Sequence, residues 1–439
     1  MLRLGTASVE TTPPLGTHLA GSGMGDHRPA RTVLDPLYAK AIVVAAGARK
    51  LCLLTLDVCI ITADFTAAVR AAAARLGIAD VMVHSLQLHS APSTGTCMLD
   101  PDYPVATTPA TEYLLGSECA YVALLLERAI AAITQADAAL APAELAWARG
   151  RRDDLAYNRR EEGTIDPEVA VCAFRPSAGG APLATLLHYT CHPVNVFLNG
   201  ACHTPRERYY AVSADWPGVW AAATARDGGG AALVVNGCCG NLNPGPYRKE
   251  TVWDHERQGR ELAATSAALR RDLRYAPVTR VAALTRTLTL PYREVPAARL
   301  AEVERVLGGT LAPRFGADGQ ADPAWFTAAS TKSIELLRRR CPQFAYEIQA
   351  FRLGDVALVG LPGEPFCEGQ LALKAASPAA LTLVAHMTTQ YVGYLPTRAA
   401  YERFGHEANR ECTYWAKFAP GALDLVVDTA SAMLRELWG

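Results

Sequence analysis

Polar residues collect in the stretch "HSLQLHSAPS", residues 84–93, directly after the apolar segment "VMV". The stretch holds two histidines, His84 and His89, a glutamine, Gln87, and three serines. Imidazole groups can bind a metal ion, act as acid or base, or cap a turn through hydrogen bonds to the backbone. Polar residues this dense after a strand-like segment indicate a site, and the stretch alone leaves these three roles open.

Four other segments share this layout, in which an apolar strand runs into a polar turn that contains Gly or Pro. They are "LLHYTCHPVN", "ALVVNGCCGNLNP", "ALVGLPGEP" and "LVAHMTTQYVGYLPT". In α/β proteins, ligands bind beyond the carboxyl ends of strands, so these turns predict a shared pocket. Its nitrogen and oxygen donors would be His89, His192, Glu364 and Tyr394. Two imidazoles and a carboxylate around an open position suit a hydrolytic zinc ion.

Each of these residues also has a purely structural interpretation. His89 and His192 could cap strand ends in the core, and Glu364 in "PGEP" could cap the helix that follows. The Asn and Gly residues of "NGCCGNLNP" could satisfy a turn that needs positive φ. Because the ligands lie far apart in sequence, no spacing rule decides between the structural and the functional interpretation.

The elements that must position these residues alternate between strand-like and helix-like segments, which favours an α/β fold. A first strand and turn are predicted within 1–16, and further strands at 38–46, 51–57, 80–85, 169–174, 183–189, 231–237, 281–292, 344–364 (two strands) and 381–388. Helices are predicted at 64–77, 117–140, 213–225, 254–273, 296–341 (with an internal turn), 365–376 and 421–437. No repeat or low-complexity linker divides the chain, so we expect one domain, 1–439, with a mixed β-sheet core flanked by helices.

Composition narrows the partners. The 439 residues are half apolar and carry a formal net charge of −1, which argues against nucleic acid or an anionic membrane as the main partner. The apolar runs "AIVVAA" and "LCLLTL" are interrupted by Arg49, Lys50 and Asp57, so we expect no segment that spans a bilayer. The N-terminus lacks an apolar signal region, and the 12 cysteines show no disulfide framework. We expect a cytoplasmic protein that acts on a small molecule and does not insert stably into membranes.

The polar segments resemble, in the same order, those of the neutral/alkaline (non-lysosomal) ceramidase family. The resemblance also includes "ASVETTPPLGTHLAG", "YNRR", "SADWPG" and "YVGYLPTRAAYE", and it covers nearly the whole chain up to the last helix. It implies a ceramidase-like catalytic domain of α/β type that hydrolyses an amide with a bound zinc ion. Nothing strand-rich follows the closing helix, so we expect no C-terminal immunoglobulin-like domain.

The resemblance also implies roles for single residues. His192, Glu364 and Tyr394 fall on the family's zinc ligands, and His89 falls on its catalytic histidine. The remaining ligand of the family is the first histidine of a His-Thr-His-Ser motif, and Gln87 stands at that position here. Residues 87 and 89 would share one face of a strand. In this register His84 is expected to be structural.

Three further residues correspond to the family's catalytic machinery or replace parts of it. Arg159 in "YNRR" matches an arginine important for activity, His406 replaces an expected tyrosine, and Asn243 replaces a serine. With His89, the candidate catalytic residues are therefore Arg159, Asn243 and His406, and the candidate substrate-binding residues are Asn158, Asn236 and Gly240.

The glutamine at position 87 makes the metal the open question, because a neutral amide oxygen is a much weaker zinc ligand than imidazole. Gln87 could ligate weakly or leave a gap filled by water. A nearby histidine (His84, His89 or His406) could take its place. The metal could also be gone, with a polar pocket left behind.

The main hypothesis is a zinc-dependent hydrolase of an amide or related acyl bond, with His89 assisting as acid or base. The missing family serine, secretion signal and extra domain argue for a small soluble substrate rather than a sphingolipid. One alternative is a metal-independent enzyme for acyl transfer, condensation or isomerisation, with Cys191, Cys238 or Cys239 as a possible nucleophile. Another is a binding protein without catalysis.

Overall fold

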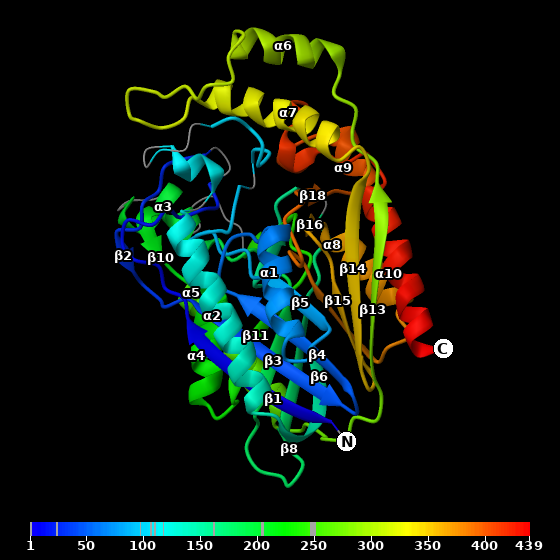
Figure 1. Ribbon diagram of the computed structural model, residues 1–439. Helices are drawn as coiled ribbons and strands as arrows, with labels where there is room; N and C mark the ends of the chain where they lie inside the picture. Colours follow the sequence, from blue (N-terminus) through cyan, green and yellow to red (C-terminus); the bar gives the residue numbers. More distant parts are fainter. Residues whose placement is uncertain are drawn as a thin grey trace.

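A computed structural model of the chain describes residues 2–22, 25–96, 98–105, 108, 111–116, 118–160, 163–202, 206–245 and 252–439. Two β-sheets pack face to face between two layers of helices (Figure 1). The larger sheet has the order β11-β9-β8-β6-β1-β3-β4-β5, with bounds Ala231–Asn236, Ala184–Tyr189, Glu168–Pro176, Ala141–Arg151, Arg3–Glu10, Tyr38–Ala46, Arg49–Leu56 and Asp80–Ser85.

The smaller sheet has the order β13-β14-β15-β17, with bounds Val281–Leu290, Phe344–Leu353, Val356–Gly360 and Leu381–Ala385. Short two-stranded pairs complete the strands: β2 (Thr32–Val33) with β10 (Ala211–Val212), β7 (Ala156–Asn158) with β12 (Leu242–Pro244), and β16 (Glu364–Pro365) with β18 (Tyr394–Leu395). In the two main sheets the pairs β4–β5, β9–β11 and β15–β17 are parallel and the others are antiparallel, so both sheets are mixed.

Helices cover the outer face of each sheet. The larger sheet is covered by α1 (Ala63–Ala74), α2 (Cys119–Ala138), α4 (Asp215–Arg226) and α5 (His255–Arg270). The smaller sheet is covered by α8 (Cys367–Ala376) and α10 (Ala422–Trp438). Helices α6 (Ala297–Leu307) and α7 (Pro323–Arg340) form a lobe at one end of the molecule, and α3 (Asn195–Cys202) and α9 (Arg398–Arg403) are short (Figure 1).

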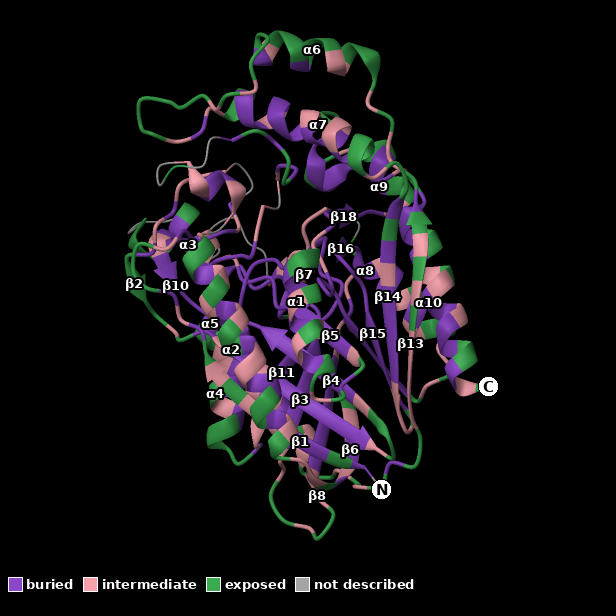
Figure 2. Ribbon diagram, viewed as in Figure 1, coloured by how far each residue is buried: buried purple, intermediate pink, exposed green. Residues whose placement is uncertain are grey.

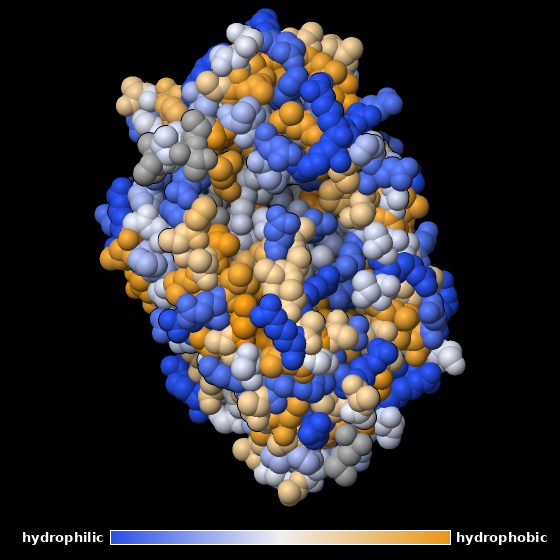
Figure 3. Space-filling model, in the orientation of Figure 1, coloured by the Kyte–Doolittle hydropathy of each residue, from blue (hydrophilic) through white to orange (hydrophobic). Residues whose placement is uncertain are grey.

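The space between the two sheets is filled by apolar side chains from both, such as Leu53 and Met82 on one side and Phe351 and Leu383 on the other. Full burial of one such side chain stabilises the fold by roughly 1.5–3 kcal/mol. Buried residues accordingly line both sheets, whereas α6 is mostly exposed (Figure 2). On the face shown in Figure 3, polar and apolar side chains are interspersed.

The two sheets are joined at the carboxyl ends of their strands. The backbone N–H of His386, after β17, donates to the carbonyl of Asn236 at the end of β11, at 3.1 Å. The N–H of Ser85, at the end of β5, donates to the carbonyl of Met387 at 3.2 Å, and the N–H of Thr389 donates to β5 at 3.0 Å. The turns after these strands are therefore brought into one place.

The expected mixed β-sheet core flanked by helices is confirmed, with the strands divided between two sheets. Strand β6 was missing from the sequence prediction. Its sequence "APAELAWARGR" is rich in Ala and contains Pro142 and Gly150, residues that are depleted in strands. Pairing with β8 along the strand, from Ala143 with Pro176 to Arg151 with Glu168, overrides this local preference.

Helix α2 corrects one expectation. The helix is long enough and apolar enough to cross a membrane, whereas the sequence predicted no segment with these two properties. The expectation that no segment spans a bilayer rested on strand-like apolar runs that charged residues interrupt. Helix α2 is apolar over most of its length and has few charged residues, such as Glu127 and Arg128. Residues including Leu125 and Ala129 pack on the larger sheet. The absence of stable membrane insertion stays a prediction, as does the single domain.

Candidate active site

His192 and Glu364 form a buried pair between the two sheets. His192 follows β9, and Glu364 lies in β16, after β15. The Nδ1 atom of His192 lies 2.9 Å from the carbonyl oxygen of Leu242, which can only accept, so Nδ1 carries the proton. Its Nε2 atom lies 3.3 Å from Oε2 of Glu364, and the two side chains are 0% and 4% exposed. A lone pair thus faces a carboxylate, and a proton or a cation between them is needed to make the contact favourable.

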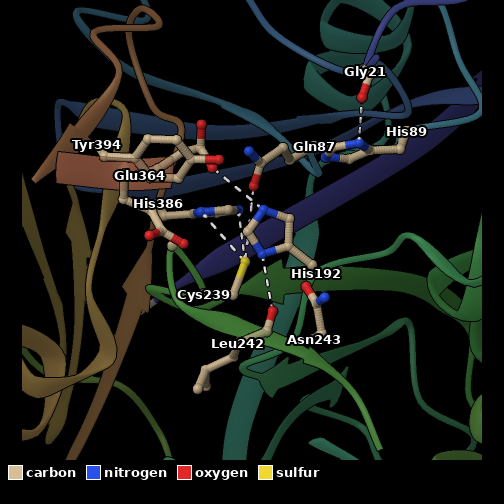
Figure 4. A network of polar contacts seen from close by, with 12 residues as sticks. Gly21, Gln87, His89, His192, Cys239, Leu242, Asn243, Glu364, His386 and Tyr394 are labelled. Atoms are coloured by element: carbon tan, nitrogen blue, oxygen red, sulfur yellow. Dashed lines mark hydrogen bonds and ion pairs between the residues drawn. The ribbon is translucent and has the colours of Figure 1, made fainter. Parts of the chain in front are cut away.

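His89 presents a second imidazole nitrogen to the same place (Figure 4). Its Nδ1 atom donates to the carbonyl oxygen of Gly21 at 2.8 Å, and its buried Nε2 atom has no hydrogen-bond partner among the described residues. The ring centroid lies 5.6 Å from that of His192. Burial, followed by the charge of His192, holds the pKa of His89 well below its ordinary value. His89 is therefore a neutral base with an open lone pair.

The glycine at position 21 is required for this arrangement. Gly21 has φ +91°, and a Cβ atom there would lie 2.8 Å from Cα of His89. Only glycine combines that backbone conformation with so close an approach. The loop that contains Gly21 therefore fixes the orientation and the tautomer of His89.

Gln87 is not on the face of a strand, which corrects the sequence expectation for residues 87 and 89. Strand β5 ends at Ser85, whose hydroxyl accepts the N–H of Gln87 at 3.2 Å, and Gln87 has φ +62°. The turn that follows β5 replaces the strand geometry on which the expectation rested. The buried Gln87 amide still points into the cluster, with Oε1 3.8 Å from Sγ of Cys239 (Figure 4).

His84 uses both of its ring nitrogens in the structure. Its Nδ1 atom donates to the carbonyl oxygen of His386 at 2.7 Å, and its Nε2 atom accepts the N–H of Asn236 at 3.0 Å. Burial lowers the pKa of His84 to about 4, so the ring is neutral. With both nitrogens occupied, His84 ties the two sheets together and has no lone pair left for a metal.

Arg159 is the centre of a polar network beside the pair. Its Nη2 atom donates to Tyr394 Oη at 3.3 Å and to the carbonyl oxygen of Gly240 at 2.7 Å. Its Nη1 atom lies 3.4 Å from Oδ1 of Asn243, and its Nε atom lies 2.8 Å from Oε1 of Glu407. The structure thus brings the predicted residues Arg159, Asn243, Gly240 and Tyr394 together.

Two electrostatic effects act on this network. Burial, followed by the charge of Glu364, raises the pKa of Tyr394 well above its ordinary value. For Glu407, burial would raise the pKa, but Arg159 leads the favourable charges that bring it to about 2. Glu407 is therefore a carboxylate at any ordinary pH and holds Arg159 in place.

The three predicted substrate-binding residues are placed differently. Asn158 turns away: its Nδ2 atom donates to the carbonyl oxygen of Thr164 at 2.9 Å, within its own turn. Asn236 lies at the centre but is used structurally, with Nδ2 donating to Leu86 at 3.2 Å. Gly240 allows close packing, because a Cβ atom there would lie 2.5 Å from the carbonyl oxygen of Glu364. The roles of all three stay predictions.

His406 lies at the edge of the site rather than at its centre. Its ring centroid is 5.6 Å from that of Tyr394, at an interplanar angle of 76°. Its catalytic role and its possible place as a ligand instead of Gln87 stay predictions.

His386 belongs to the cluster although the sequence analysis did not single it out. It follows β17, is fully buried, and points toward Gln87 and His192, with Nδ1 3.7 Å from Sγ of Cys239 (Figure 4). Burial, followed by the charge of His84, holds its pKa well below the ordinary value. The signal was present in "LVAHMT", where a histidine ends an apolar strand, but Tyr394 was taken from that segment instead.

The thiols near the site are poor nucleophiles. Burial raises the pKa of Cys191, Cys238 and Cys239 above the ordinary value, so each stays protonated. Cys238 packs in the apolar core of the smaller sheet, and Cys191 Sγ lies 3.4 Å from the amide of Gln258. A thiolate is the reactive form of cysteine. These environments favour the interpretation of the three residues as packing residues.

The donor set fits a zinc ion only with the help of a tyrosine. Within the part of the chain that the structure describes, no three His, Cys, Asp or Glu side chains could hold a metal ion by themselves. His192 donates Nδ1–H to a backbone carbonyl, the usual orientation of a metal-bound histidine. His192 Nε2 and the Glu364 carboxylate are donors of the kinds that zinc takes in proteins, and the Tyr394 phenol is the third donor that the resemblance implies.

Comparisons with known proteins identify the fold. No family model matches the chain, and no curated protein matches it. The solved structure of neutral ceramidase from Pseudomonas aeruginosa matches with a TM-score of 0.72 and 18% identity, over 99% of this chain and 75% of that one. A ceramidase complexed with C2 matches with a TM-score of 0.72 and 19% identity, over the same shares. The chain therefore has the fold of the neutral ceramidases.

Proposed function

We propose that the chain hydrolyses an amide or related acyl bond in a small soluble substrate. One observation carries the proposal: the open Nε2 atom of His89 lies beside the buried His192–Glu364 pair, on a fold shared with amide hydrolases. A neutral imidazole with one nitrogen fixed and one open is suited to proton transfer. In this proposal the chain works in the cytoplasm, without nucleic acid and without insertion into a membrane.

The residues of the chain divide the work as follows. His89 removes a proton from the attacking water at Nε2 and returns it to the leaving nitrogen. Arg159 and Asn243 stabilise the negative oxygen that develops on the carbonyl, or hold a carboxylate of the substrate. The loop with Gly21 keeps the His89 lone pair directed at the site, since it fixes Nδ1–H.

Zinc is the proposed cofactor. His192, Glu364 and Tyr394 would hold it, with Gln87 as a weak additional ligand, and the ion would polarise the carbonyl and lower the pKa of a bound water. Support for a cation comes from the two acceptors of His192 and Glu364 that face each other at 3.3 Å.

Removal and return of metal test the proposal directly. The purified chain is assayed on a panel of N-acyl amides before chelation, after chelation and dialysis, and after one equivalent of zinc, with metal content measured at each step. We expect activity and metal content to fall together and to return together. Amide hydrolysis that is indifferent to both treatments would contradict the zinc-dependent form. The exposed Glu402→Gln variant on α9 serves as a control for Glu364→Gln.

A second candidate is a metal-independent enzyme of the same fold, for acyl transfer, condensation or isomerisation. The observation that favours it is Gln87 in place of an imidazole, together with the His192–Glu364 contact, which becomes an ordinary ion pair if a proton lies between the two groups. Near-stoichiometric metal in untreated protein, lost in Glu364→Gln, would contradict this candidate. If His192→Ala and Glu364→Gln left every activity unchanged, a binding protein would be the remaining interpretation.

A further inference from the structure

A cavity of about 420 Å³ opens beside the candidate active site. Its wall is formed by the segment 404–415 together with Thr327 of α7. The volume lies within the range of sites for small molecules. The segment that forms the wall follows α9 and includes the 3₁₀ turns His406–Ala408 and Tyr414–Ala416.

His406 connects the cavity to the catalytic centre. On one side its ring is stacked on Trp415, with centroids 5.3 Å apart at 27°, and its edge contacts Tyr394 at 5.6 Å. Its carbonyl oxygen accepts the indole N–H of Trp415 at 3.0 Å and the amide of Asn409 at 3.1 Å. Its ring nitrogens make no hydrogen bond within the described residues. The imidazole is thus fixed in place while its polar atoms remain available to a ligand.

The backbone at the entrance of this segment is strained. Phe404 has φ +61°, a conformation that a bulky side chain rarely adopts, and Gly405 has φ +120°. Arg160 holds the turn: its Nη2 atom donates to the carbonyl oxygen of Phe404 at 2.9 Å, and a Cβ atom on Gly405 would lie 2.6 Å from its Nη1. Strain of this kind persists where the surroundings enforce it, and it occurs often at ligand sites. Here it places the ring of Phe404 on the cavity wall.

The described cavity wall carries one guanidinium group, that of Arg410. Arg410 lies with its guanidinium 4.1 Å from the centre of the Phe404 ring, which leaves its N–H groups free at the edge. Arg293 donates to the carbonyl oxygen of Asn409 at 2.6 Å. Among the described residues neither arginine has a carboxylate within 4 Å. Glu411 is the one acidic side chain of the described wall.

We propose that this cavity binds a carboxylate of the substrate at Arg410, with a planar or apolar group against Phe404 and Trp415. The substrate class is then an amide that also carries a carboxylate, with enough chain between the two groups for the amide to reach the catalytic centre past His406. This assignment rests on the proposed function, because it places the scissile amide at His89 and the His192–Glu364 pair. The cavity is then the part of the molecule that selects the substrate.

Calorimetric titration of the full chain with two matched probes tests the assignment. N-acetylphenylalanine carries the carboxylate, and N-acetylphenylalaninamide differs from it only in lacking that charge. Loss of one charge-assisted contact should weaken binding by about tenfold, so we expect Arg410→Gln to do so for the first probe. We expect the second probe to change by less than about twofold. Arg410→Lys keeps the charge but not the bidentate fork and should fall between the two.

Glu411→Gln should change the affinity for the carboxylate probe in the opposite direction. Removal of a negative charge from the wall should tighten binding of the carboxylate probe by roughly twofold to threefold, in line with a partly exposed charge. Arg305→Gln on the exposed surface of α6 is the matched control and should change nothing. Equal losses for both probes, or weaker binding in Glu411→Gln with no effect in Arg410→Gln, would overturn the assignment.

Binding and turnover separate the two proposals. If the carboxylate probe binds as described but no amide of the panel is hydrolysed under any metal condition, the hydrolase proposal fails and the cavity assignment stands. The chain could instead hydrolyse uncharged amides, with Arg410→Gln leaving the kinetics of both uncharged and charged amides unchanged. In that case the cavity assignment fails and the hydrolase proposal stands.

Discussion

Two buried polar clusters lie close together in this molecule and differ in how completely their hydrogen bonds are satisfied. In the first, the amide of Gln370 donates to Asp166 and Thr190 at 2.5 and 2.7 Å, and Lys374 donates to Asp166 and Glu168 at 2.7 and 2.8 Å. Carboxylates and donors are matched within this cluster. The second cluster begins two residues after Thr190, at His192.

Among the described residues of the second cluster, two imidazole nitrogens face the site without a hydrogen-bond donor. Nε2 of His192 faces the Glu364 carboxylate at 3.3 Å, and Nε2 of His89 has no partner within the described residues. A satisfied buried network rigidifies a fold, whereas an unsatisfied one is unfavourable unless a ligand completes it. The comparison teaches that burial and polarity alone do not mark a site; the difference here is that open atoms of His89, His192 and Glu364 meet in one place. The predictions below separate the clusters by stability and by activity.

The largest expected effect is on activity in the open cluster. Glu364→Gln should lower kcat/KM for an amide substrate by about a thousandfold, equivalent to ~4 kcal/mol of transition-state stabilisation. The same change should leave the free energy of unfolding unchanged or raise it, because it removes a buried charge that faces another acceptor. Steady-state kinetics and urea unfolding on the same preparation check both parts. A large loss of stability with little loss of activity would contradict the prediction and show that Glu364 has a structural role.

The matched cluster should give the opposite pattern. Lys374→Met leaves Asp166 buried with its main countercharge removed, and breaking a buried pair in this way typically costs about 3–5 kcal/mol of unfolding free energy. Activity per folded molecule should not change, since Lys374 contacts no residue of the open cluster in the described structure. Urea unfolding with active-site titration of the folded fraction measures this. Loss of activity without loss of stability would show that the two clusters are coupled.

Glu407 combines features of both clusters. Its carboxylate is paired with Arg159 and Arg160 at 2.8 and 2.7 Å, as in the matched cluster, and Arg159 belongs to the candidate active site. Its pKa falls from the ordinary 4.5 to about 2 in the folded chain. A lowered pKa stabilises the fold by ~3 kcal/mol above pH 4.5, and this contribution is lost as the pH falls from 4.5 toward 2. The stability difference between the wild type and Glu407→Gln should therefore be largest at neutral pH and shrink in acid.

Urea unfolding midpoints at pH 7, 5 and 3.5 test the Glu407 prediction. Glu402→Gln, on the exposed surface of α9, is the control and should not alter the pH dependence. A difference between wild type and Glu407→Gln that stayed constant across this range would contradict the assignment of the lowered pKa to this carboxyl.

The sequence predicted the elements well because periodicity and strand-end polarity are local signals. It placed His89, His192, Glu364 and Tyr394 on turns that the structure brings together. The pairing of strands into two sheets, and thus the inclusion of His386, depends on contacts across the sheets that no local pattern contains. The two-acceptor contact of His192 and the open nitrogen of His89 could not be predicted either, because both depend on which backbone carbonyl each ring meets.

Gln87→His gives the smallest expected change and sharpens the comparison most. Residue 87 has φ +62°, and histidine is among the residues that adopt this conformation with little strain. The imidazole would enter the open cluster in place of an amide whose side-chain hydrogen bond, within the described residues, is with the Cys239 thiol at 3.8 Å. Because imidazole is a stronger zinc ligand than a neutral amide, zinc affinity should rise by about tenfold. Competition with a chromophoric chelator measures the change, and Gln87→Asn, which offers no imidazole, is the control. If His and Asn at position 87 gave equal affinities, residue 87 would not contact the ion, and the unsatisfied atoms of His89, His192 and Glu364 would have to be completed by substrate instead.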